Sequence, residues 1–218
     1  GGLKFLKRTI SDRRIMGADN ILKLETFIDA SYATHNNMQG HTGGAMSFGW
    51  GVIHEKASKQ KINTKSSTES EVVGVSKYVP HKIQMINFLH AQGYDLKKCV
   101  LYQDNQSAIK MEKNGRKSCT GNSRHISIRY FFVKDRVDKG EFTIEYCPTE
   151  CMLADYFTKP LQGALFIKFR AVVMGWAHID TLKNAAMSPP KERVENGVRG
   201  DIAHKTGRSY LQAAMTQN

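Results

Sequence analysis

The chain has 218 residues, of which 40% are hydrophobic and 24% charged, a composition typical of one globular domain with extensions. A formal net charge of +12 favours a polyanionic partner, most often nucleic acid. No apolar run has the length of a membrane span, and the first residues lack the apolar core of a signal peptide. We therefore expect an intracellular protein with no membrane partner and, because the first residue is not Met, a fragment of a longer chain.

Four cysteines, at positions 99, 119, 147 and 151, do not have metal-site spacing. A zinc site would need a second closely spaced pair beside Cys147 and Cys151, and the sequence contains none. We interpret all four as free thiols in a reducing compartment.

The first part of the chain predicts a basic helix, three strands and a long helical region. The helix is expected over residues 3–10, the strands over 22–31, 45–54 and 58–65, and a polar loop over 32–44. The helical region begins with a capping box, either Ser66 with Glu69 or Thr68 with Glu71. Pro80 is expected to interrupt it.

The second part of the chain alternates strands and helices. The continuous apolar run Cys99–Tyr102 is typical of a buried central strand. Helices are expected over residues 107–113, 124–139, 149–160 and 161–176, and the last strand over 142–147. From about Asp180 the chain is polar and patternless, which predicts a disordered tail. This order predicts an α/β fold in which helices flank a five-stranded mixed sheet.

Four acidic residues occupy settings in which a lone carboxylate would be costly. Asp29 follows the strand-forming residues Thr26–Ile28, Asp104 ends the expected central strand, and Glu71 and Asp155 lie on expected helices. If the fold gathers them, mutual repulsion raises their pKa values or requires a cation. Oxygen ligands suit Mg²⁺ or Mn²⁺ better than zinc. The competing interpretation is that these acids cap helices and turns.

Five segments, in order, resemble the ribonuclease H domain of copia-type retrotransposon polyproteins. They are residues 27–33 (FIDASYA), 59–71 (KQKINTKSSTESE), 103–109 (QDNQSAI), 123–132 (SRHISIRYFF) and 153–161 (LADYFTKPL). The resemblance implies a ribonuclease H-like fold, with three antiparallel strands followed by parallel ones. It also implies hydrolysis of the RNA strand of RNA–DNA hybrids during reverse transcription, with the reverse transcriptase domain of the same polyprotein as a partner.

The resemblance also divides the chain. Residues 1–20 would be the tail of the preceding reverse transcriptase or its connection, and 21–162 the ribonuclease H-like domain. Residues 163–179 would form a C-terminal helix and 180–218 the tail.

The resemblance assigns the four acids to two Mg²⁺ ions, which Mn²⁺ can replace. Asp29 would bridge both ions, and Glu71 and Asp104 would bind the ion at the leaving group. Asp155 would bind the ion that carries the attacking water. Glu71 is preferred to Glu69 because it begins the apolar face of its helix and matches the second acid of the family's Thr-Glu-x-Glu pattern.

A hybrid is recognised through 2′-hydroxyls, groove width and phosphates rather than base sequence. Hydroxyl and amide side chains beside the acids would reach the sugars, and basic ones the phosphates. The candidates are Ser66, Ser67, Thr68, Asn105, Gln106, Lys65, Arg124 and His125, with Lys59, Lys61, Lys110, Arg116 and Lys117 as further phosphate contacts. For His125, helix capping is an equal alternative to substrate contact.

Two departures from the family pattern stand out. The second Asp of many members is Ser31 here, and no His precedes Asp155 where cellular ribonucleases H carry one that aids product release. An inactive nucleic-acid-binding remnant of a retroelement is the alternative function. An integrase-like nuclease is a third, disfavoured by the fourth acid. The resemblance places the protein in a cytoplasmic particle or the nucleus.

Overall fold

β2 (Lys23–Ser31) is the middle strand of a five-stranded sheet in the computed structural model, which describes residues 2–19, 22–114 and 124–184. The sheet has the order β5-β3-β2-β6-β7. Its other strands are β3 (His41–Ser47), β5 (His54–Lys59), β6 (Lys98–Gln103) and β7 (Thr143–Tyr146). β3 is antiparallel to both β2 and β5, whereas β6 is parallel to both β2 and β7. The predicted α/β fold is confirmed, with helices flanking a five-stranded mixed sheet in which antiparallel strands are followed by parallel ones.

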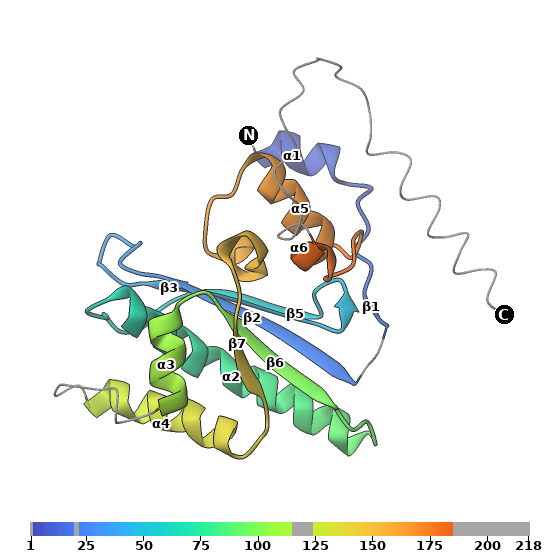
Figure 1. The fold of residues 1–218 in the computed structure, drawn as a ribbon. Helices are drawn as coiled ribbons and strands as arrows, with labels where there is room; N and C mark the ends of the chain where they lie inside the picture. The colour runs from blue at the N-terminus through green and yellow to red at the C-terminus, as the bar shows by residue number, and fades with distance from the viewer. Residues whose placement is uncertain (1, 20–21, 115–123, 185–218) are drawn as a thin grey trace. The chain divides into compact units, whose positions relative to one another are not determined.

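Helices cover both faces of this sheet (Figure 1). On one face lie α2 (Ser67–Ala91), α3 (Gln106–Asn114) and α4 (Arg124–Asp138). The opposite face carries α5 (Gly163–Val173), α6 (Thr181–Asn184) and two 3₁₀ turns, η2 (Thr149–Cys151) and η3 (Leu153–Phe157). Side chains along β2 point to both faces of the sheet. Leu24 and Ile28 pack in the core under α2, whereas Phe27 packs in the core with Phe169 of α5. α1 (Gly2–Arg8) comes first, and β1 (Gly17–Ala18) pairs with β4 (Gly49–Trp50).

The second strand begins earlier than predicted, at His41 instead of residue 45. Glycines in this segment usually indicate a loop, but Gly43 and Gly44 allow neighbouring side chains to approach the strand closely. A Cβ at Gly44 would lie 2.3 Å from the Tyr78 ring of α2, and one at Gly43 would lie 2.6 Å from Thr158. The glycines therefore let both helical layers pack tightly on β3.

The third strand and the long helix also differ from prediction. The strand covers residues 54–59 rather than 58–65, because Gln60 turns inward and donates to Thr42 and to the backbone of Ser70. α2 continues unbroken through Pro80. Its apolar face packs on the sheet along its length, which offsets the cost of about 3 kcal/mol for an interior proline.

The C-terminal part is more compact than predicted. Residues 149–157 form two 3₁₀ turns instead of an α-helix. The expected tail does not begin at Asp180, since Leu182 is buried and Lys183 Nζ lies 2.7 Å from Glu25 Oε1. The rest of that prediction, like the loop that contains Arg116 and Lys117, lies outside the described residues.

Two smaller predictions can also be compared with the structure. Cys99, Cys147 and Cys151 are free thiols, as expected, and Cys119 lies outside the described residues. Within the described chain, no helix has both the length and the apolar character needed to cross a membrane.

Candidate metal centre

The parallel pairing of β2 with β6 brings two of the predicted acids together. Phe27 of β2 stands opposite Tyr102 of β6, and Asp29 and Asp104 each follow this pair by two residues. Both strands end at the same edge of the sheet because they run in the same direction. Asp29 is almost fully buried and Asp104 is half-buried.

Glu71 reaches this edge from the N-terminal end of α2, one turn after its first residue, Ser67. The Ser66 side chain caps the helix by accepting from the backbone N–H of Glu69, and Ser70 Oγ donates to the Ser31 carbonyl of β2. These bonds fix the end of α2 against the sheet, where Ala30 N–H donates to Glu71 Oε1 at 3.2 Å. One carboxylate oxygen from each of Asp29, Glu71 and Asp104 lies within 4.8 Å of the others.

The electrostatics of this three-acid group, Asp29, Glu71 and Asp104, favour a cation. Burial, and then the charges of Asp29 and Asp104, raise the pKa of Glu71 well above its usual range. Burial and the charge of Asp29 raise the pKa of Asp104. Carboxylates held this close carry a cost near neutral pH unless a proton or a metal ion neutralises them. The donor set is composed entirely of carboxylate oxygens, which fits Mg²⁺ or Mn²⁺.

Asp155 lies beside the three-acid group but has an internal counter-ion. Its Oδ1 atom is 2.8 Å from Lys159 Nζ, which in turn is 3.6 Å from Asp29 Oδ1. Thr158 Oγ1 donates to Asp29 from the same segment. Burial raises the pKa of Asp155 to about 7, with contributions from Asp29 and Asp104, although Lys159 opposes the rise. The Lys159 ammonium is thus paired with Asp155, the acid that was expected to bind a metal ion.

The other candidate contact residues surround these acids to different degrees. Lys65, Ser67 and Gln106 are exposed, and Thr68 is half-buried. Ser66 is the helix cap already described, and Asn105 Oδ1 accepts from the Ala108 N–H at the start of α3. Glu69 accepts from the Lys65 N–H, so it caps the helix and lies outside the three-acid group. The side chains of Arg124 and His125 lie outside the described residues.

Sequence reasoning missed two groups at this site. Lys159 follows Asp155 by four residues, a spacing that favours an ion pair in a helical segment and could have identified it. Gln103, whose Nε2 donates to Glu71 Oε2 at 3.5 Å, gave no local signal.

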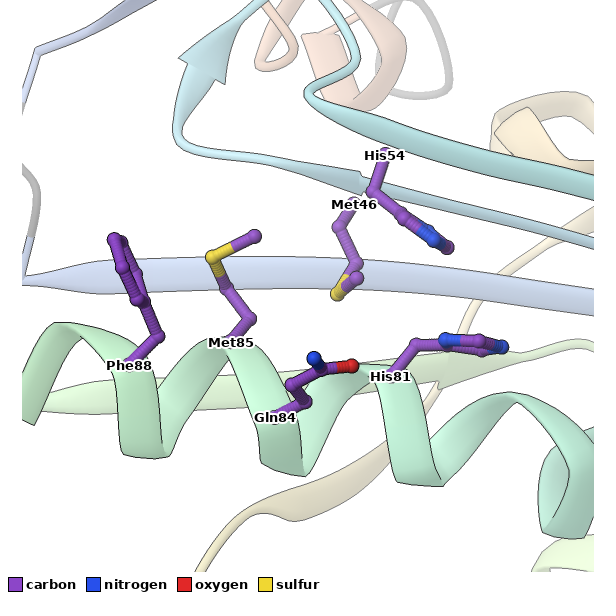
Figure 2. A pocket seen from close by; sticks show the side chains of 6 residues that line it. All are labelled: Met46, His54, His81, Gln84, Met85 and Phe88. Carbon is purple, nitrogen blue, oxygen red and sulfur yellow. The ribbon is translucent and has the colours of Figure 1, made fainter.

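A separate hollow lies between α2 and the outer strands (Figure 2). Its volume is about 270 Å³, and its lining comprises Met46, His54, His81, Gln84, Met85 and Phe88. Lys56 Nζ lies 2.9 Å from His81 Nε2, and this ammonium disfavours a metal ion there. None of the four acids lines it, so the hollow is not part of the candidate metal centre.

Comparison with curated proteins finds retrotransposon polyproteins. The chain is 31% identical over 159 residues to the retrovirus-related Pol polyprotein from transposon TNT 1-94 of Nicotiana tabacum, covering 72% of this chain and 12% of that protein. It is 28% identical over 173 residues to the Pol polyprotein from transposon RE1 of Arabidopsis thaliana, covering 78% and 12%. It is 27% identical over 166 residues to the transposon Ty1-NL2 Gag-Pol polyprotein of Saccharomyces cerevisiae, covering 72% and 9%. The chain thus spans about a tenth of the length of these relatives.

No family model matches the chain, and the similar solved structures include ribonucleases H. LC11-RNase H1, isolated from compost, has a TM-score of 0.47 and 10% identity, covering 63% of this chain and 93% of that one. The N-terminal RNase H domain of rv2228c from Mycobacterium tuberculosis has a TM-score of 0.43 and 12% identity, covering 75% and 98%. In sequence, the homologues of this chain are retrotransposon Pol polyproteins of the copia and Ty1 type.

Proposed function

We propose that this chain is the ribonuclease H domain of a copia-type polyprotein and hydrolyses the RNA strand of RNA–DNA hybrids. The observation that carries the proposal is the three-acid group, Asp29, Glu71 and Asp104, at the edge where β2 and β6 end. The Pol homologues support it, because their matched region includes most of the described fold. We further propose that the domain follows the reverse transcriptase and acts inside the cell, in a cytoplasmic particle or the nucleus.

In this proposal Asp29, Glu71, Asp104 and Asp155 would hold two divalent ions, Mg²⁺ or Mn²⁺. When bound, such a pair of ions supplies an activated water and stabilises the leaving oxygen of a phosphodiester. Asp29, Glu71 and Asp104 form the part of the site already assembled. Asp155 joins it when its carboxylate is released from the Lys159 ammonium. Thr158 holds the Asp29 carboxylate in place through its hydroxyl.

Substrate binding in this proposal uses basic and hydroxyl side chains near α2. Burial, and then the charges of Arg129, Lys56 and Lys61, lower the pKa of Lys77. Cations that repel one another in this way favour an anionic ligand, and the phosphates of a hybrid provide one. We propose that the exposed Ser67 hydroxyl, in the first turn of α2, contacts a sugar 2′-hydroxyl.

Incubation with end-labelled RNA–DNA hybrid, double-stranded RNA and double-stranded DNA in Mg²⁺ tests this function. We expect cleavage confined to the RNA strand of the hybrid, and loss of cleavage by orders of magnitude in Asp104→Asn. Binding of the hybrid without cleavage, by both the parent and this variant, would indicate the inactive remnant. Cleavage of double-stranded DNA would indicate an integrase-like nuclease.

A further inference from the structure

Glu112 on α3 is a carboxyl group with no exposed surface. Neither of its oxygens has a hydrogen-bond partner among the described residues. Burial raises its pKa well above the usual range, and the Gln103 side chain is the polar group that opposes this rise. An ionised carboxylate in such a place would cost several kcal/mol, so burial favours the neutral form.

Gln103 connects this buried carboxyl to the candidate metal centre. It is the last residue of β6, adjacent to Asp104, and its side chain is fully buried. Its Nε2 atom donates to Glu71 Oε2 at 3.5 Å, whereas its Oε1 atom has no donor among the described residues. Three buried oxygens, Gln103 Oε1 and both oxygens of Glu112, therefore lack donors among the described residues, and the Gln103 side chain lies beside Glu112.

One proton on Glu112 reduces this shortage, because it removes the charge of the carboxyl and supplies one donor. Gln103 can donate to an ionised Glu71 only through its amide nitrogen, which leaves its amide oxygen to be satisfied elsewhere. A neutral carboxyl is the group that can donate to that oxygen, whereas an ionised Glu112 would compete with Glu71 for the same amide N–H groups. Buried polar groups are normally paired, and a proton on Glu112 supplies the missing donor.

We propose that Glu112 is a positioning residue, a neutral carboxyl whose O–H holds the Gln103 amide with its N–H group toward Glu71. The Glu112–Gln103 pair thereby presents Glu71 as an ionised ligand to a divalent cation. This inference rests on the proposed function, since it concerns the affinity of the same site for Mg²⁺. Removing such an outer partner typically weakens metal affinity by about 10- to 100-fold.

Melting curves recorded over a Mg²⁺ titration at pH 7 test the proposal without an activity assay. Glu112→Met should raise the Mg²⁺ concentration at half-maximal stabilisation by about tenfold or more. In EDTA this variant should melt close to the parent, because an apolar side chain in place of the buried carboxyl offsets the donor that Gln103 Oε1 loses. Glu112→Gln keeps an N–H donor for Gln103 Oε1, so its half-maximal concentration should stay within about twofold of the parent's. Lys113→Met, at an exposed position of the same helix, is the control and should match the parent.

A second variant keeps the test informative if Glu112→Met does not fold. Gln103→Leu removes the connecting amide and should show the same loss of Mg²⁺ affinity. Where both single variants fold, the double variant should lose no more than either alone, because they act through one connection. An unchanged half-maximal concentration in Glu112→Met or Gln103→Leu would overturn the positioning role while leaving the proposed function intact. A parent that Mg²⁺ does not stabilise would overturn the proposed function, and this inference with it.

Discussion

Replacing Lys159 by Met should make the protein less stable without metal and improve its binding of Mg²⁺. The Lys159 ammonium lies 2.8 Å from Asp155 and 3.6 Å from Asp29, so it neutralises carboxylates that are 1% and 4% exposed. At an effective dielectric constant of about 20, the shorter contact alone is worth about 6 kcal/mol before desolvation. Because the lysine side chain is 37% exposed, solvent screening and desolvation reduce this to a net value of about 1–2 kcal/mol.

In EDTA at pH 8, that loss corresponds to a decrease in Tm of about 3–6 °C for a domain of this size. In Mg²⁺ the difference in Tm between Lys159→Met and the parent should narrow. The variant should reach half-maximal stabilisation at about tenfold less Mg²⁺ than the parent, since the ion no longer competes with an ammonium group. Lys139→Met is a matched control, because Lys139 also lies 2.8 Å from an acid four residues away, but in an exposed pair. It should change stability by less than about 0.5 kcal/mol. Equal melting of Lys159→Met and the parent in EDTA, with the same Mg²⁺ dependence, would refute the counter-ion role.

Three further outcomes follow from the same structure. Glu71→Gln should melt higher than the parent in EDTA at pH 8 and lower than the parent in saturating Mg²⁺. The reason is that the pKa of Glu71 is raised in the folded state, so its ionisation costs increasing stability as pH rises from about 4.5. A lower Tm of the variant in EDTA would contradict this cost. Lys82 is fully buried, and burial lowers its pKa to about 7. The cost of burying its charge is present below that pH and is relieved as pH rises toward 10.5. The Tm of the parent should therefore rise relative to that of Lys82→Met between about pH 7 and pH 9, and parallel Tm curves for the two proteins would exclude this effect. Hybrid affinity should fall steeply between about 50 and 200 mM salt, as measured by fluorescence anisotropy, and a flat response would show that the basic surface does not bind phosphates.

The sequence predicted the elements whose own residues carry the pattern. β2 and β6 appear as apolar runs that lead into an acid, whereas their parallel pairing, which brings Asp29 and Asp104 together, was implied by the family resemblance. The start of β3 could not be predicted, because Gly44 indicates a loop until the Tyr78 ring is seen packed against it. Glycine is required at position 44 because of Tyr78, a residue more than thirty positions away in the sequence.

The missed parts of the site are also long-range. Glu112 lies between two lysines on a short helix, a pattern typical of a solvated face, yet the helix turns it into the core beside Gln103. Lys159 belongs to a segment that the resemblance included, but its ion pair with Asp29 depends on η3 packing over β2. Local patterns identified the acids, whereas their counter-ions and hydrogen-bond donors depend on tertiary packing.

The proposed function requires the three-acid group to bind a divalent cation. A crystal soaked in Mn²⁺ and measured at a wavelength with strong manganese anomalous scattering tests this requirement. We expect an anomalous peak within about 2.0–2.4 Å of carboxylate oxygens of Asp29, Glu71 and Asp104, and its loss in a crystal of Asp29→Asn. A parent crystal with saturating Mn²⁺ and no peak among these three carboxylates would contradict the claim.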